Sequence, residues 1–146
     1  MNESGNANVN PKSNSFVLDS FALLAYLGGE PGMPRIKELL GQSENGKCRL
    51  FLCMINFGEV LYLAERRRGF AVAQSVQALI ESLPIEIIEA SRNLILDAAH
   101  IKAQYTLSYA DAFVVATAVR ETAIILTGDP EFESVETMAG VEWLKK

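Results

Sequence analysis

The sequence predicts a single α/β domain in which helices cover both faces of a parallel β-sheet. Predicted strands alternate with predicted helices along the chain, and each strand is a short, continuously apolar run rather than an alternating one. Strands of this kind are buried on both faces, as in parallel sheets. The chain has 146 residues, of which 49% are hydrophobic and 21% charged. This is enough for one domain with a substantial core, but not for two domains of ordinary size.

The chain begins with a polar segment. Residues 1–15 contain Pro11 and show no periodicity, so we expect a flexible tail there and one folded domain over residues 16–146. The apolar run 16–18 predicts the first strand, which ends at Asp19. Apolar residues at helical spacing then predict a helix through residues 21–27, which the adjacent Gly28 and Gly29 end.

Helical spacing and chain breakers define the remaining elements. Gly69 separates two helices, and Pro84 ends the second of them. Runs rich in Ile, Leu and Val mark the strands. In chain order we expect a helix from about residue 34, a strand over 50–53, helices over 56–68 and 70–83, a strand over 85–88, helices over 92–104 and 109–121, and strands over 123–126 and 141–144.

Four carboxylates lie where this fold places functional sites, at the carboxyl ends of the strands. Asp19 follows the first strand, Glu59 lies near the start of the helix after the second, Asp111 opens the helix over 109–121, and Asp129 follows the fourth strand. The helix after Asp111 rises about 15 Å. The strand and turn that lead to Asp129 return by about 17 Å. Asp111 and Asp129 are therefore expected at the same edge of the sheet.

Each of these carboxylates also has a structural explanation as a helix cap. Ser108 with Asp111 and Asn56 with Glu59 resemble capping boxes, and Asp19 and Asp129 each precede a predicted helix. Four unrelated caps at one sheet edge are a less economical account than one acidic site. Because carboxylates about 4 Å apart repel by roughly 4 kcal/mol at an effective dielectric near 20, such a site requires a cation or bound protons.

The residue types at this edge favour a hard divalent cation. Oxygen ligands without His or Cys partners select Mg²⁺ or Mn²⁺ over Zn²⁺. The one histidine, His100, lies in the middle of a predicted helix, and Cys48 and Cys53 fit no zinc spacing and are expected to be reduced core thiols. An acidic Mg²⁺ site with open water positions is suited to the chemistry of phosphate esters.

Four segments together closely resemble the PIN-domain ribonucleases, most of all the small VapC-type toxins of type II toxin–antitoxin systems. The specific parts are the D-A-x-x-x-A-T-A block, which begins at Asp111, and the T-x-D-x-x-F block, which begins at Thr127. The supporting segments are 16–20, which ends in Asp19-Ser20, and 56–60, which contains Glu59. The resemblance extends from about Phe16 to the C-terminus.

This resemblance implies both a fold and an activity. The fold would be a five-stranded parallel sheet flanked by helices, and the activity a Mg²⁺- or Mn²⁺-dependent endonuclease acting on single-stranded or structured RNA. By position, Asp19, Glu59, Asp111 and Asp129 would form the acidic quartet that binds the metal and carries catalysis, and Thr127 would help to orient a ligand. The family also suggests a small antitoxin partner and a homodimer, and it includes RNA-processing members that are not toxins.

Other functions remain open from the residues alone. One is a Mg²⁺-dependent phosphohydrolase or receiver-like phosphoacceptor domain, and another is a catalytically silent partner-binding domain. The net charge of −5 argues against binding nucleic acid through bulk positive charge. The one dense basic run, Arg66 to Arg68, is more simply explained by favourable charge at a helix C-terminus than by RNA contacts. Without a signal peptide or an apolar membrane-spanning run, we expect a cytoplasmic protein that does not enter a membrane.

Overall fold

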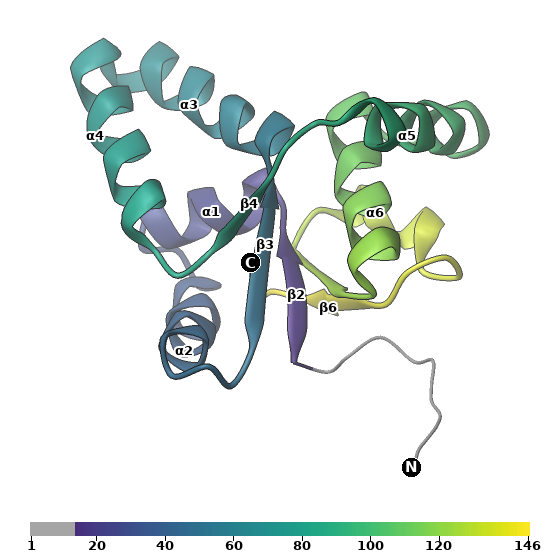
Figure 1. Cartoon of the computed structure of the whole chain (residues 1–146). Helices are drawn as coiled ribbons and strands as arrows, with labels where there is room; N and C mark the ends of the chain where they lie inside the picture. Colours follow the sequence, from purple (N-terminus) through teal and green to yellow (C-terminus); the bar gives the residue numbers. More distant parts are fainter. Residues whose placement is uncertain (1–13) are drawn as a thin grey trace.

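The computed structural model describes residues 14–146, and their backbone follows the predicted alternation of strands and helices (Figure 1). Residues 1–13 of the predicted tail lie outside the described residues, and Ser15 already belongs to the first strand. The elements are β2 (Ser15–Leu18), α1 (Ser20–Leu27), α2 (Met33–Glu44), β3 (Arg49–Cys53), α3 (Met54–Arg68), α4 (Phe70–Ser82), β4 (Glu86–Ile88), α5 (Arg92–Gln104), α6 (Tyr109–Glu121), β5 (Ile124–Thr127), the 3₁₀ helix η1 (Pro130–Val135) and β6 (Val141–Trp143).

The five strands form one sheet in the order β4-β3-β2-β5-β6, and every neighbouring pair is parallel. This confirms the predicted fold class. β2 lies at the centre, between β3 and β5. Leu18 at the end of β2 pairs with Leu126 of β5, so the next residues along each chain segment, Asp19 and Thr127, emerge side by side at the carboxyl edge.

The sheet separates two groups of helices, as Figure 1 shows. Inward residues of one face, including Val17, Phe51 and Ile125, pack against α5 and α6. Alternate residues of the same strands pack against α1 and α2, and a third cluster joins α1 to α3 and α4. Because strands covered on both faces have no solvent-facing side, their sequences are apolar throughout.

The start of α3 differs from the prediction. The helix begins at Met54, directly after β3, and its N-cap is Cys53, which makes no side-chain capping bond. Asn56 therefore lies inside the first turn, where its side chain is 0% exposed and donates a hydrogen bond to the carbonyl of Ala110. The interpretation of Asn56 and Glu59 as a capping box is wrong, because the strand leads into the helix without an intervening turn.

Two large apolar residues are exposed to solvent. Leu79 of α4 is 41% exposed, although the next residue, Ile80, is fully buried in the cluster that joins α1 to α3 and α4. Trp143 is 40% exposed on the edge strand β6, and its indole N–H donates to Glu136. Cys48 and Cys53 are buried free thiols, as expected. No helix within residues 14–146 has the length and apolar character of a membrane span.

Gly128 is required by a close approach between two elements. A Cβ atom at this position would lie 2.4 Å from the ring of Phe21 on α1. We expect Gly128→Ala to lower the free energy of unfolding by about 1–3 kcal/mol through overpacking. Gly41→Ala is the matched control, since nothing lies within 4 Å of its Cβ position in α2, and we expect it to raise stability slightly. Urea denaturation of both variants measures the difference, and equal effects would contradict this account.

Candidate metal centre

Asp19 lies at the carboxyl end of β2 with both of its carboxylate oxygens engaged. Its side chain is 1% exposed. Oδ1 caps α1 by accepting a hydrogen bond from the backbone N–H of Ala22 at 2.8 Å. Oδ2 accepts a short hydrogen bond from the hydroxyl of Thr127. The carboxylate is therefore fixed in orientation by one helix start and by the adjacent strand end.

Thr127 connects two of the predicted site residues. Its side chain is fully buried at the end of β5. While it donates to Asp19, its Oγ1 also accepts a hydrogen bond from the backbone N–H of Asp129 at 2.9 Å. The turn that carries Asp129 is thereby held next to Asp19.

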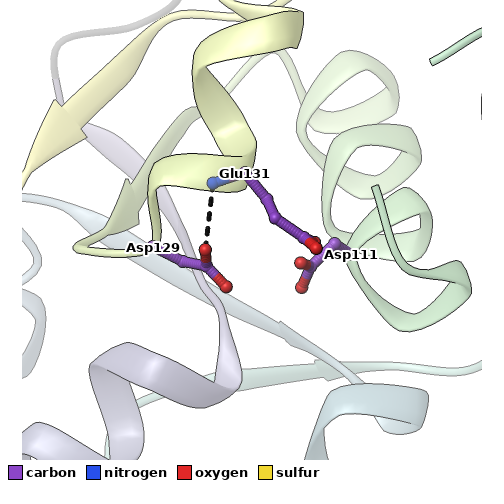
Figure 2. Close-up of side chains that lie close together, drawn as sticks. All are labelled: Asp111, Asp129 and Glu131. Atoms are coloured by element: carbon purple, nitrogen blue, oxygen red, sulfur yellow. Dashed lines mark hydrogen bonds between the residues drawn. The ribbon is translucent and has the colours of Figure 1, made fainter. Parts of the chain in front are cut away.

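The carboxylates of Asp111, Asp129 and Glu131 come together at this edge of the sheet (Figure 2). One oxygen each from Asp111, Asp129 and Glu131 lies within 4.8 Å of the others. Asp111 is in the first turn of α6, where its backbone N–H donates to the N-cap Ser108. Asp129 caps η1 by accepting from the backbone N–H of Glu131 at 2.9 Å. Asp111 and Asp129 thus meet at one edge, as the length of the intervening chain predicts.

Glu131 was not identified from the sequence. It is exposed, but Figure 2 shows its carboxylate pointing toward Asp111, and its Oε1 accepts a hydrogen bond from the backbone N–H of Ser108 at 3.1 Å. Glu131 therefore completes the capping of α6 from a distant segment. The available signal was its position two residues after Asp129, in the first turn of a helix that begins at the same sheet edge.

Burial and mutual repulsion shift the protonation of these groups. Burial raises the pKa of Asp19 to about 7, against hydrogen bonds from Thr127 and Ala22, and the charge of Asp129 raises it further. The pKa of Asp111 is also raised, first by burial, then by the hydrogen bond that its protonated carboxyl group donates to Glu131, and then by the charges of Asp19, Asp129 and Glu131. The pKa of Glu131 is lowered, because its carboxylate accepts from Asp111 and from Ser108.

Glu59 is not a member of the three-carboxylate group. It is a half-buried residue of α3, and one of its oxygens, Oε1, is buried without a hydrogen-bond partner among residues 14–146. Among the predicted site residues, the structure therefore links Asp19, Thr127, Asp129 and Asp111 through hydrogen bonds and charge. It leaves the carboxylate of Glu59 outside that linked set.

This arrangement is chemically suited to a divalent cation. The group consists of carboxylate oxygens alone, which favour hard ions such as Mg²⁺ and Mn²⁺. Without a cation, part of the group must hold protons, as the raised pKa values of Asp19 and Asp111 indicate. The buried, unpaired oxygen of Glu59 is a further acceptor with no protein donor in the described part of the chain.

Comparison with known proteins gives a family match and several similar folds. The family model described as "PIN domain" matches residues 16–137. A VapBC2 complex from Rickettsia felis, bound to a DNA fragment from its promoter, is 15% identical with a TM-score of 0.72, and the alignment covers 90% of this chain and 99% of that one. DNA-bound VapBC from Salmonella typhimurium is 16% identical with a TM-score of 0.70, covering 88% and 96%.

A third similar structure is Mycobacterium tuberculosis VapC20, described as a toxin that cleaves the sarcin–ricin loop. It is 18% identical with a TM-score of 0.66, and the alignment covers 82% of this chain and 94% of that one. At such low identity these likenesses concern the fold. No curated protein is a significant match by sequence.

The raised pKa of Asp19 predicts how stability depends on pH without metal. A carboxyl group with a higher pKa in the folded protein keeps its proton longer when folded. Its contribution is fully present below the ordinary pKa of 3.8 and is lost as the pH rises toward about 7. In EDTA, we expect the free energy of unfolding to fall between pH 5 and pH 8, and Asp19→Asn to reduce that fall by on the order of a few kcal/mol.

Urea denaturation at several pH values measures this effect. Asparagine can still cap α1 and hydrogen bond with Thr127, so Asp19→Asn tests the charge rather than the contacts. A variant that is less stable than the parent at pH 8 would contradict the prediction, and would assign Asp19 a purely structural role as a cap.

Proposed function

The chain belongs to the PIN domain family, and on that premise we propose that it is a metal-dependent endoribonuclease that hydrolyses RNA phosphodiester bonds. The observation that carries this proposal is that Asp19, Asp111 and Asp129 meet at the carboxyl edge of the sheet. Thr127 links Asp19 to Asp129 through hydrogen bonds, and the charges of Asp19 and Asp129 raise the pKa of Asp111. Carboxylates gathered at this edge are suited to holding Mg²⁺ or Mn²⁺ rather than to stabilising the metal-free fold.

Each residue has a proposed part in the reaction. Asp111 and Asp129 hold the cation, and Asp19 completes its binding site with an orientation fixed by Thr127. Glu59 contributes a carboxylate from α3. When bound, the cation neutralises the phosphate and lowers the pKa of an attacking water. Glu131 holds the start of α6 through Ser108, and so keeps Asp111 in place.

We further propose that the protein is the toxin of a toxin–antitoxin pair. Two similar folds come from VapBC complexes and a third from a VapC toxin. In this chain, α1, α3 and α4 enclose a hollow with apolar walls that include Leu27, Val72 and Val76, and with Arg67 and Arg68 among the lining residues. An antitoxin segment with apolar and acidic side chains fits that surface. We also propose a homodimer, for which the hollow between α5 and α6 offers apolar side chains that include Ile101, Val119 and Met138.

The activity prediction uses charge-removing substitutions. The purified protein should cleave RNA with Mg²⁺ or Mn²⁺ and stop when EDTA is added. Asp111→Asn and Asp129→Asn should each lower the rate at least about 100-fold, because each removes a proposed metal ligand. Glu133→Gln is the matched control, since it removes an exposed negative charge from the same 3₁₀ helix, and it should leave the rate unchanged.

Several outcomes would reject the proposal. Equal cleavage by the parent and Asp111→Asn would indicate a contaminating ribonuclease. Metal-dependent turnover of a small phosphoester without RNA cleavage would favour a phosphohydrolase. If the protein cleaves neither RNA nor a small phosphoester, and calorimetry detects no Mn²⁺ binding, a silent partner-binding domain becomes the better account.

The antitoxin prediction concerns the hollow between α1, α3 and α4. When the chain is produced together with its proposed antitoxin, Val72→Asp should weaken the complex at least about 10-fold, because it places a charge in an apolar contact. Leu96→Asp adds the same charge to an exposed position on α5 and should leave the complex intact. Size-exclusion chromatography and calorimetry compare the two. Equal binding by both variants would exclude this surface as the antitoxin site.

A further inference from the structure

Asn56 is a buried amide whose role is not helix capping. Its side chain is 0% exposed within the first turn of α3. Its Nδ2 donates to the backbone carbonyl of Ala110 at 3.1 Å, across 54 residues of sequence. Ala110 directly precedes Asp111, so this hydrogen bond fastens the start of α3 to the turn that carries a carboxylate of the candidate metal centre.

Two oxygen atoms on this part of α3 are buried and accept no hydrogen bond from any of residues 14–146. They are Oδ1 of Asn56 and Oε1 of Glu59. Residues three apart in a helix lie on the same face, with their Cβ atoms about 5–6 Å apart. A single water molecule can donate one hydrogen bond of about 2.8 Å to each of two acceptors on the same helix face.

Stability alone does not explain an asparagine at this position. An apolar side chain of similar size would avoid burying an unpaired carbonyl oxygen, which is unfavourable in the protein interior. The amide of Asn56 instead donates a hydrogen bond to α6 through Nδ2 and leaves Oδ1 free to accept one from a further group. Glu59, one turn along the helix, likewise has a buried oxygen without a hydrogen-bond donor among the described residues.

We propose that Asn56 is a positioning residue for Glu59. It holds the start of α3 against α6, and its Oδ1 shares with the Glu59 carboxylate a water molecule from the hydration shell of the cation. The inference rests on the proposed function, because it assumes that the acidic group binds a cation. Mg²⁺ held by a few carboxylates keeps several of its waters, and groups that orient metal ligands indirectly typically change metal affinity by 10–100-fold.

The test separates this role from a merely structural one. Asn56→Leu removes both the donor and the unpaired acceptor while keeping the branched shape of the side chain at Cγ. We expect its melting temperature in EDTA to equal or exceed that of the parent, and its Mn²⁺ dissociation constant by calorimetry to rise roughly 10–100-fold.

Thr117→Val is the control. Thr117 is also buried, but its hydroxyl donates to the Phe113 carbonyl one turn earlier in α6 and makes no hydrogen bond to a residue of the acidic group, so Mn²⁺ affinity should not change. Unchanged Mn²⁺ affinity in Asn56→Leu would overturn the proposal.

A measurement on the parent protein keeps the proposal testable if Asn56→Leu fails to fold. During a Mg²⁺ titration followed by NMR, the side-chain amide signals of Asn56 should shift together with the backbone amides of Asp111 and Asp129. Shifts at Asp111 and Asp129 without any at Asn56 would overturn the positioning role and leave the cation site standing. No shift at any of them would overturn the cation site, and the positioning role with it.

Discussion

The candidate site depends on helix starts that hold carboxylates in place. Asp19 caps α1, Asp129 caps η1, and Asp111 lies in the first turn of α6, so the backbone N–H groups of three helices surround one acidic group. Helix N-termini carry partial positive charge and stabilise nearby anions. Capping and metal binding are therefore not competing explanations of Asp19 and Asp129, because the hydrogen bonds that cap the starts of α1 and η1 also hold these carboxylates at the shared edge.

These N–H groups reduce the repulsion within the site but do not abolish it. Asp19 accepts two hydrogen bonds, yet burial still raises its pKa to about 7. The pKa of Asp111 is raised by burial and by its acidic neighbours. A metal-free fold optimised for stability would place fewer carboxylates here, or expose them to water. Repulsion between carboxylates therefore remains in the metal-free site, and a divalent cation would neutralise it, as expected where stability is balanced against function.

The sequence predicts the elements better than it predicts the environments of their side chains. α5 and α6 have the predicted bounds and the strands differ by one or two residues, because apolar periodicity and breakers such as Gly69 act locally. The role of Asn56 depends on Ala110, 54 residues away, and that of Glu131 on Ser108, 23 residues away. Neither partner is visible in a local pattern. Leu79 shows a related limit, since helical spacing marks an apolar face but not whether another element covers it.

An acidic protein with a polyanionic substrate can attract that substrate only where positive charge is concentrated locally. With a net charge of −5, long-range electrostatics would repel the proposed RNA substrate. The acidic edge would be the least favourable surface of all without its cation, since phosphate would meet several carboxylates there. A bound Mg²⁺ or Mn²⁺ reverses the sign of the interaction over a few ångströms only. Substrate affinity and catalysis would then depend on the same ion, and a metal-free molecule would neither hold nor cleave RNA.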